Sequence, residues 1–254
     1  MLAKFNSVLI IGMGLIGSSI ARALYENNIT SNIFGLDSNM DVIKKCLELD
    51  ILLKGETDIN NFSEQFDLII ICTPLNSYKN IFSYLNNYVS EDTLLTDVGS
   101  TKVSVIEDFK NHVNNKNIKF VPSHPIAGLE KSGPQHGFSS LFQNRYCIIT
   151  PINKDDKYTD KIIALWESIG MKIEKMDSKK HDRVLAMTSH IPQLIAYSVV
   201  TTSTELEAQL KDEVIKYSAA GFRDFTRLAG SDPVMWRDIY SNNKDAVIEM
   251  LGRF

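Results

Sequence analysis

The chain has 254 residues, of which 44% are hydrophobic and 23% charged, and its formal net charge is −4. This composition is typical of a soluble globular protein with one large domain or two smaller ones. It offers nothing general that attracts nucleic acid or an anionic membrane, so we expect neither as a partner.

The N-terminus and the cysteines bear on location and on metal binding. The first five residues lead almost directly into an apolar run, with no basic region ahead of a cleavable segment. No apolar stretch is expected to be long enough to cross a bilayer. Cys46, Cys72 and Cys147 are far apart and lack C-x-x-C spacing, which argues against disulfides and metal sites. We therefore expect a cytoplasmic protein without a metal.

Short apolar runs alternate with amphipathic segments along the first two thirds of the chain. The expected strands are residues 8–11, 33–36, 68–71, 93–96, 120–121 and 146–150. Helical spacing lies between most of them, for example at 15–25 and 76–89. This alternation predicts an α/β fold with a doubly wound parallel sheet, and the near-continuous apolar strands predict that helices cover both of its faces.

The pattern changes after Asp177, where strand-like runs stop. The rest of the chain is expected to be helical, with breaks near Pro192, Gly221, Gly230 and Pro233. We therefore divide the chain into an α/β domain, residues 1–177, and a small all-helical domain, residues 178–254. So short a helical segment is too small to be stable alone, and we expect it to pack on the first domain and on a second copy of itself, as a homodimer.

A glycine fingerprint follows the first expected strand. Gly12, Gly14 and Gly17 match G-x-G-x-x-G, with an amphipathic helix after them. In a dinucleotide-binding site of the Rossmann type, these glycines would permit the tight turn, the approach of a pyrophosphate and close helix packing. Leu15 and Ile16 would then belong to the helix N-terminus that faces the phosphates. A glycine-rich turn without a ligand is the alternative, and the strand-helix context argues against it.

Asp37 ends the second expected strand at the usual distance from the glycines. A carboxylate there accepts hydrogen bonds from ribose hydroxyls and repels a 2′-phosphate, and no arginine follows it. NAD is therefore the expected cofactor rather than NADP. The alternative for Asp37 is an N-cap of the next helix.

Polar side chains follow the other expected strands. Ligands of an open parallel sheet bind outside the carboxyl ends of its strands, so Thr73, Pro74 and Asp97 are further candidates for cofactor contacts. His124 follows the strand at 120–121 and is the acid–base candidate, because a neutral imidazole can take a hydroxyl proton near pH 7. A structural histidine is the alternative.

Six ordered segments give the chain a resemblance to the prephenate dehydrogenase family over nearly its whole length. They are GMGLIGS (12–18), TDVGSTK (96–102), HPIAGLEKSGP (124–134), SHIP (189–192), GFRDFTRLA (221–229) and DPVMWRD (232–238). The resemblance implies an NAD-dependent oxidative decarboxylation of prephenate to 4-hydroxyphenylpyruvate on the route to tyrosine. It also implies a helical dimer interface.

The resemblance implies roles for individual residues. His124 would polarise the ring hydroxyl, and Ser100 would orient it. Arg227 would hold a substrate carboxylate, for which its bidentate fork is suited; a surface or dimer salt bridge is the alternative. Further substrate-site residues implied by the resemblance are Glu130 and Asp224, as ionic partners of the arginine, together with His190 and Gln193.

One position departs from the family pattern, which often reads Ser-His-x-Pro-His where this chain has Gln193. An amide cannot titrate near neutral pH, so recognition of the substrate side chain is open. An arogenate or dual-specificity cyclohexadienyl dehydrogenase is therefore the nearest alternative. More distant alternatives are another Rossmann hydroxy-acid dehydrogenase and a non-catalytic NAD-binding protein.

Overall fold

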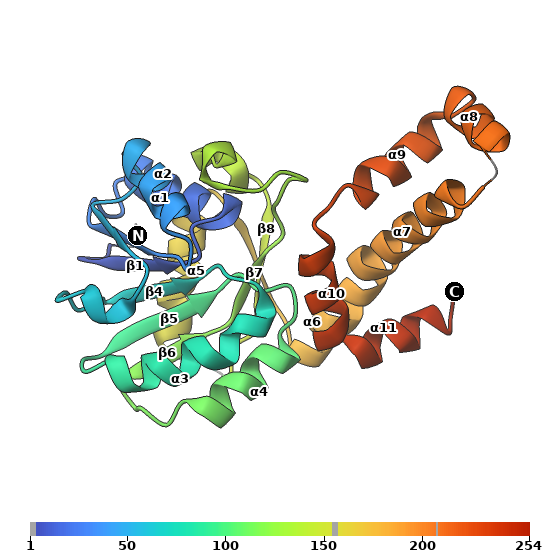
Figure 1. Cartoon of the computed structure of the whole chain (residues 1–254). Helices are drawn as coiled ribbons and strands as arrows, with labels where there is room; N and C mark the ends of the chain where they lie inside the picture. Colours follow the sequence, from blue (N-terminus) through green and yellow to red (C-terminus); the bar gives the residue numbers. More distant parts are fainter. Residues whose placement is uncertain (1–3, 154–156, 207) are drawn as a thin grey trace. The chain divides into compact units, whose positions relative to one another are not determined.

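The computed structural model describes residues 4–153, 157–206 and 208–254 (Figure 1). Internal contacts divide the chain into two compact units, Met1–His181 and Asp182–Phe254. The sequence pattern placed the division after Asp177, whereas the contacts place it after His181, within helix α6 (Ser178–Leu185).

A six-stranded parallel sheet forms the centre of the first unit. Its strands are β1 (Val8–Ile11), β2 (Ile33–Leu36), β3 (Lys54–Glu56), β4 (Leu68–Ile71), β5 (Thr93–Asp97) and β6 (Ile118–Val121). They lie in the order β3-β2-β1-β4-β5-β6, and every neighbouring pair is parallel. This is the strand order of the doubly wound Rossmann fold, with its switch point between β1 and β4. The predicted fold class is confirmed.

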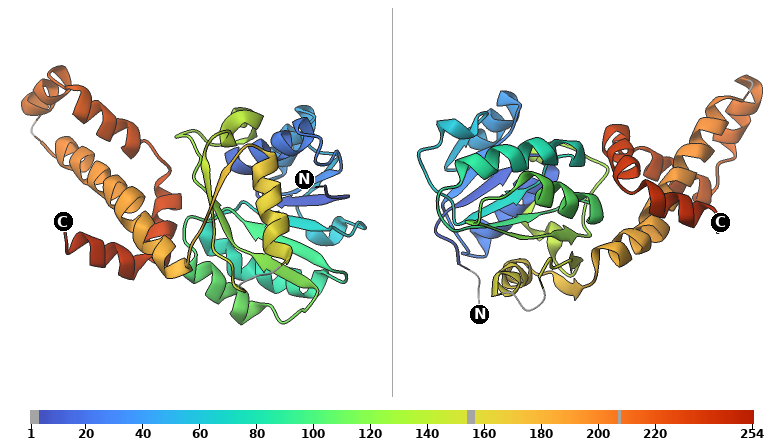
Figure 2. Two further views of the ribbon diagram at one scale, coloured as in Figure 1. Left: turned by 180° about the vertical axis from the view of Figure 1, so that it is seen from behind. Right: turned by 90° about the horizontal axis from the view of Figure 1, so that it is seen from below.

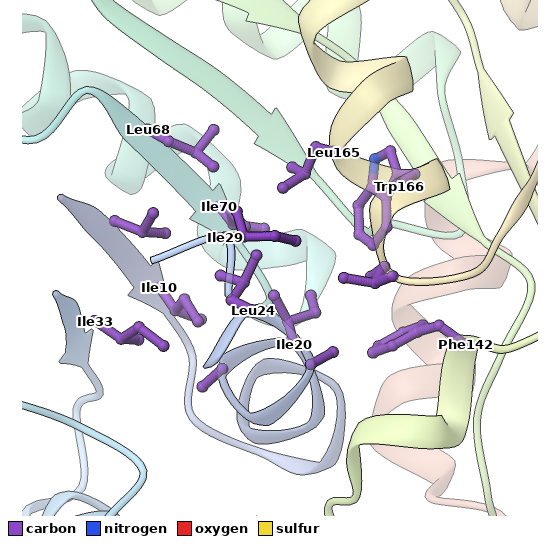
Figure 3. Packing of buried hydrophobic residues seen from close by; sticks show 14 of the residues in the cluster. Ile10, Ile20, Leu24, Ile29, Ile33, Leu68, Ile70, Phe142, Leu165 and Trp166 are labelled. Carbon is purple, nitrogen blue, oxygen red and sulfur yellow. The ribbon is translucent and has the colours of Figure 1, made fainter. Parts of the chain in front are cut away.

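Helices cover both faces of this sheet. They are α1 (Leu15–Glu26), α2 (Met40–Glu48), α3 (Tyr78–Tyr88), α4 (Val103–His112) and α5 (Lys157–Ser168). On one face, Ile10 and Ile70 pack with Ile20 of α1 and Trp166 of α5 (Figure 3). β1 and β4 are buried at every position, as the near-continuous apolar runs predicted.

Aromatic side chains fill the space on the opposite face. The ring of Phe82 on α3 lies 5.5 Å from those of Phe109 on α4 and Phe120 on β6, measured between centroids. Edge-to-face contacts at this distance add to the energy of burial. Helices α3 and α4 therefore cover one face of the sheet, and helices α1 and α5 cover the other.

A second, three-stranded sheet was not expected. It contains β7 (Ser123–Pro125), β8 (Tyr146–Ile149) and β9 (Lys172–Lys175), with β7 antiparallel and β9 parallel to β8. The strand predicted at 146–150 thus belongs to this sheet and not to the parallel one. β3, β7 and β9 escaped prediction because they are short and carry charged residues or a proline, the composition of edge strands.

The second unit is helical, as predicted. It holds the end of α6, a π-helical turn (Ala186–His190), α7 (Ile191–Thr204), α8 (Ala208–Lys216), α9 (Ala220–Ala229), α10 (Pro233–Asn242) and α11 (Lys244–Leu251). Within this unit α7 and α9 lie side by side (Figures 1 and 2).

The predicted helix break near Pro192 is wrong. The helical segment runs without interruption through Ser178–Thr204. Proline lacks an N–H and clashes with the preceding turn, and here the π-helical turn directly before α7 provides the local change in geometry. The breaks near Gly230 and Pro233 are confirmed, since Gly230 follows α9 and Pro233 begins α10.

The same segment corrects another expectation. By length and composition alone, Ser178–Thr204 could cross a membrane, although no stretch was expected to be long enough. The feature is weak evidence for a membrane span, because core helices of soluble proteins pass the same criterion. Here the segment contacts α9 and α11 of its own unit.

Candidate active site

The glycine loop between β1 and α1 has the geometry of a dinucleotide site. Gly12 has φ +94°, and a Cβ there would lie 2.8 Å from the carbonyl carbon of Cys72 and from Thr73 Cγ2. Only glycine fits a position that is both left-handed and this crowded. The turn therefore brings the end of β1 against the residues that follow β4.

The next two glycines meet opposite requirements. A Cβ on Gly14 would meet no atom within 4 Å, whereas a Cβ on Gly17 would overlap the carbonyl oxygen of Gly12. Gly14 is the N-cap of α1 and supplies no side-chain cap, so the amides that begin at Leu15 and Ile16 suit a phosphate. The loop thus provides open space for a pyrophosphate and close helix packing behind it.

Asp37 is fixed at the end of β2. Its Oδ2 accepts the Met13 N–H at 2.9 Å, and its Oδ1 accepts the Asn39 N–H at 2.9 Å. The N-cap of α2 is Asn39, whose side chain accepts from Asp41, so the capping alternative for Asp37 is wrong. The bond to Met13 instead holds this carboxylate against the glycine loop, at the carboxyl edge of the sheet where a ribose would lie.

Thr73 and Pro74 follow β4 at the same edge. Ser77 Oγ lies 2.7 Å from Thr73 Oγ1 and donates to the carbonyl of Pro74 at 2.7 Å. Thr73 is half-buried and Pro74 is exposed. Thr73 lies beside Gly12, and the contact of Thr73 and Pro74 with a cofactor stays a prediction.

A buried ion pair lies below the end of β5. Lys102 Nζ donates to Asp97 Oδ2 at 2.6 Å, and both side chains are fully buried. Asp97 Oδ2 also accepts the Gly99 N–H at 2.9 Å and the Tyr78 hydroxyl at 3.2 Å. Burial, and then the charge of Asp97, raise the pKa of Tyr78, so this hydroxyl stays protonated as a donor.

Asp97 thus binds Lys102, Gly99 and Tyr78 within the protein, and its predicted contact with the cofactor stays a prediction. The sequence analysis did not predict the Asp97–Lys102 ion pair. The signal was present, because Lys102 follows a buried strand only five positions after its acidic partner. A buried lysine almost always has an ionic partner.

The ion pair holds the backbone next to His124. Ser123 N–H donates to Asp97 Oδ1 at 3.1 Å, and the Ser123 carbonyl accepts from Lys102 Nζ at 2.7 Å. Ser123 Oγ donates to the Asp97 carbonyl at 2.6 Å and lies 3.1 Å from Trp166 Nε1, which donates to it. His124 therefore lies on β7 at the carboxyl edge of the parallel sheet. It follows β6, as the sequence had suggested, and it also belongs to the short strand β7, which was not predicted.

A second histidine contacts the first. His124 Nδ1 lies 2.9 Å from His181 Nε2, with ring centroids 5.1 Å apart and an interplanar angle of 62°. His124 is 8% exposed, and His181 is fully buried. Sequence reasoning missed His181 because a lone histidine in a lysine-rich first helical turn reads as a surface residue.

Two further candidates in the first unit lie on loops. Ser100 is half-buried between β5 and α4, close in sequence to the Asp97–Lys102 pair. Glu130 is exposed on the loop that follows β7. Their predicted roles at a substrate stay predictions.

In the helical unit, two candidates are buried among structural partners. His190 Nδ1 lies 3.1 Å from Asn243 Nδ2, and its ring packs edge-on against Trp236 with centroids 5.9 Å apart. Gln193 is 3% exposed and donates through Nε2 to the Leu228 carbonyl on α9 at 2.8 Å. Gln193 thus connects α7 to α9, the helix that carries Arg227.

Arg227 and Asp224 share α9. Arg227 Nε lies 4.0 Å from Asp224 Oδ1, and the side chains are 58% and 74% exposed. Such a long, exposed pair contributes at most about 1 kcal/mol to stability. The predicted pairing of these two residues is present, while Glu130 belongs to the other unit.

The cysteines are reduced. Cys46, Cys72 and Cys147 are free thiols, and burial raises the pKa of Cys46 to about 11, which makes it a poor nucleophile. Among residues 4–153, 157–206 and 208–254, no group of three or more His, Cys, Asp or Glu side chains is placed to hold a metal ion.

A Rossmann sheet with a glycine loop, a fixed acidic residue after β2 and a separate helical unit defines a dinucleotide-binding protein of two units. Comparison with known families agrees. Residues 20–175 match the prephenate dehydrogenase nucleotide-binding domain, and residues 177–254 match the prephenate dehydrogenase dimerization domain. The chain belongs to the prephenate dehydrogenase family.

Individual relatives are similar over nearly the whole chain. A cyclohexadienyl dehydrogenase of Zymomonas mobilis is 36% identical over 98% of this chain and 85% of its own length. A prephenate dehydrogenase of Bacillus subtilis is 33% identical over 96% of this chain and 66% of its own length. The crystal structure of prephenate dehydrogenase from Aquifex aeolicus, with hydroxyphenyl propionate and NAD+, has a TM-score of 0.89 and 36% identity, and covers 98% of this chain and 86% of that chain.

Proposed function

We propose that this chain is a cytoplasmic, NAD-dependent dehydrogenase that converts prephenate to 4-hydroxyphenylpyruvate and CO2 for tyrosine synthesis. The observation that carries the proposal is the placement of His124. Its strand is held at the carboxyl edge of a dinucleotide-binding sheet by the buried Asp97–Lys102 pair. An acid–base group belongs at this edge, where ligands of such sheets bind.

The residues present fit NAD. The open space at Gly14, the N-terminus of α1 without a side-chain cap and the fixed Asp37 carboxylate suit a pyrophosphate and an unphosphorylated ribose. The Aquifex aeolicus relative was solved with NAD+, which supports the same cofactor here. When bound, NAD+ supplies the acceptor for the hydride from the ring carbon that bears the hydroxyl.

The charge balance of the reaction defines the task of His124. Prephenate, with two negative charges, and NAD+ give singly charged 4-hydroxyphenylpyruvate, CO2 and NADH, so no net proton is released. The electron pair of the broken carbon–carboxylate bond enters the ring as it becomes aromatic. His124 accepts a hydrogen bond from the hydroxyl and takes its proton as the hydride leaves, which stabilises the positive charge that develops at the ring carbon. The same proton then returns to the phenolic oxygen of the product.

Other residues would hold the substrate. Ser100, on the loop after β5, would orient the hydroxyl. Arg227 would bind a carboxylate through its fork, with Asp224 and Glu130 as ionic partners. His190 and Gln193 would act near the substrate side chain, Gln193 in part by connecting α7 to α9.

A dual-specificity cyclohexadienyl dehydrogenase is the second candidate. The observation that favours it is the description of the Zymomonas mobilis relative. The departure at Gln193 from the family pattern that the resemblance implies supports the same candidate. Arogenate differs from prephenate only in the side chain, so the same ring chemistry would serve both substrates.

The test is a steady-state assay of NADH formation with prephenate and with arogenate. For the wild type we expect turnover of prephenate, and the ratio of kcat/KM values decides between the two candidates. His124→Asn should lower kcat by about two to four orders of magnitude and leave NAD affinity nearly unchanged. His112→Asn is the matched control, because His112 lies on α4 with its Nδ1 2.8 Å from the Asp108 carbonyl. No NADH with either substrate would reject the function; normal kcat in His124→Asn would make that histidine structural.

A further inference from the structure

We infer that His181 is a positioning residue, which keeps the proton of neutral His124 on Nδ1 so that Nε2 faces the reaction as an acceptor. The inference rests on the proposed function for the role of His124, and it extends that function to a residue outside the resemblance motifs. The contact that carries it is the 2.9 Å approach of His124 Nδ1 to His181 Nε2.

One proton must lie between these two nitrogens. Two neutral ring nitrogens at 2.9 Å form a hydrogen bond only when one donates and the other accepts. If His181 donated, His124 would carry its own proton on Nε2 and could not accept from a substrate hydroxyl through that atom. The proposed chemistry therefore requires that His124 Nδ1 donates and that His181 Nε2 accepts.

The surroundings of His181 favour an uncharged acceptor. The ring is fully buried, and it lies near the start of α6, where the Asp177 carboxylate caps the amides of Lys179 and Lys180. Burial disfavours a charged imidazolium, and the Asp177 carboxylate offsets the positive end of the helix. A neutral His181 can accept at Nε2 while it carries its own proton on Nδ1.

A neutral partner suits this reaction. In a serine protease triad, a carboxylate stabilises a fully charged imidazolium. Here the balanced reaction releases no net proton, so His124 needs the right tautomer and a fixed ring more than added basicity. Its backbone is already held from the other side, because Lys102 and Asp97 bind the adjoining Ser123.

The tautomer can be measured without substrate. The chain has five histidines, few enough for nitrogen-15 NMR of the imidazole rings, assigned by comparison with His124→Asn and His181→Gln. We expect the wild-type His124 to carry its proton on Nδ1 and His181 to carry its proton on Nδ1, with Nε2 as acceptor. Finding the proton of neutral His124 mainly on Nε2 would overturn the inference.

A matched pair of amides tests the effect on catalysis. The terminal oxygen of glutamine reaches the place of His181 Nε2, whereas the shorter asparagine reaches only that of Nδ1. We expect His181→Gln to keep kcat within about threefold of wild type, and His181→Asn to lose at least about tenfold, since misplaced catalytic groups cost up to about a hundredfold. KM for NAD should not change in either, and His112→Gln is the control.

The outcomes separate this inference from the proposed function. Normal kcat in His181→Asn, or equal losses in both amide variants with the His124 tautomer unchanged, would overturn the positioning role. A wild type that oxidises neither prephenate nor arogenate would reject the proposed function, while the NMR spectrum would still decide whether His181 sets the His124 tautomer.

Discussion

At the scale of single residues, Asp37 has its position fixed before any cofactor binds. Its two oxygens accept the amides of Met13 and Asn39, so the carboxylate cannot turn away from a 2′-phosphate. Asp37→Asn should lower the preference for NAD over NADP by about tenfold, because it removes a like-charge repulsion of about 1.4 kcal/mol. The measurement is kcat/KM with each cofactor.

The control for this prediction is Asp41→Asn. Asp41 is an exposed carboxylate in the first turn of α2, 3.7 Å from Lys44, and its charge should not affect the preference. A ratio that is equal in wild type and Asp37→Asn would show that Asp37 does not select the cofactor.

Arg227 provides the test of the substrate site. If it binds the ring carboxylate shared by prephenate and arogenate, Arg227→Ala should raise KM for both about thirtyfold to a hundredfold, since a charge-assisted bidentate contact is worth roughly 2–3 kcal/mol. Arg227→Lys should recover only part of the loss, because it restores the charge without the fork. KM for NAD should not change.

Arg223→Ala is the matched control for Arg227, since it removes the same charge from an exposed position one turn earlier on α9. Unchanged KM values in Arg227→Ala together with a lower Tm would identify Arg227 as a structural ion-pair residue. The proposed substrate pose would then be wrong, although the fold would stand.

Residue types at strand ends were predictable from the sequence, but their partners were not. Gly12, Thr73 and Asp37 could be placed at one edge because parallel strands bring their carboxyl ends together. The His124–His181 contact joins residues 57 positions apart, and the spacing of apolar residues along the sequence does not reveal contacts over such a distance. Likewise, the burial of Gln193 against α9 follows from helix packing that a local motif does not encode.

At the scale of elements, the Asp97–Lys102 pair joins β5, the loop before α4 and β7. Removing one member of a buried ion pair leaves an uncompensated charge and costs about 3–5 kcal/mol. Lys102→Met should therefore lower the free energy of unfolding by about that amount, measured by denaturant titration. Lys102→Met combined with Asp97→Asn should recover part of the loss, because no unpaired charge is left.

Lys45→Met is the control for the buried pair. Lys45 lies 3.0 Å from Glu48 on the exposed side of α2, and such a pair contributes at most about 1 kcal/mol. Equal losses of unfolding free energy in Lys45→Met and Lys102→Met would show that the buried Asp97–Lys102 pair does not stabilise the junction of β5, α4 and β7.

Elements with strong periodicity were predicted well, and edge elements were not. The strands buried on both faces, such as β1 and β4, and helices such as α1 and α3 are where the apolar pattern places them. β9, with the sequence KIEK, is mostly exposed and has no apolar signal. The break expected at Pro192 failed because the adjoining π-helical turn allows the helix to continue.

At the scale of the whole molecule, the helical unit buries only part of its apolar side chains. Among the described residues, the buried ones are Leu185, Ala186, Ile191, Ala196, Trp236, Ile239 and Val247. α9 has no buried residue in the described part of the chain. Several apolar side chains of this unit are instead exposed, namely Val184, Met187, Leu210, Tyr217, Val234, Met235, Ile248, Leu251 and Phe254.

So much exposed apolar surface on a small unit indicates an interface, and the matching family description is a dimerization domain. We predict a homodimer that persists at micromolar concentration, because obligate helical interfaces bury apolar surface that a lone unit cannot cover. Light scattering across a dilution series measures the mass directly, and it should stay at twice that of the 28.6 kDa chain down to about 1 μM. Ile248→Asp, at a position 55% exposed in the single chain, is expected to shift the mass toward the monomer, whereas Tyr25→Asp, 65% exposed on the Rossmann unit, is not. A monomer mass for the wild type throughout the series would mean that the exposed helical surface has another partner or none.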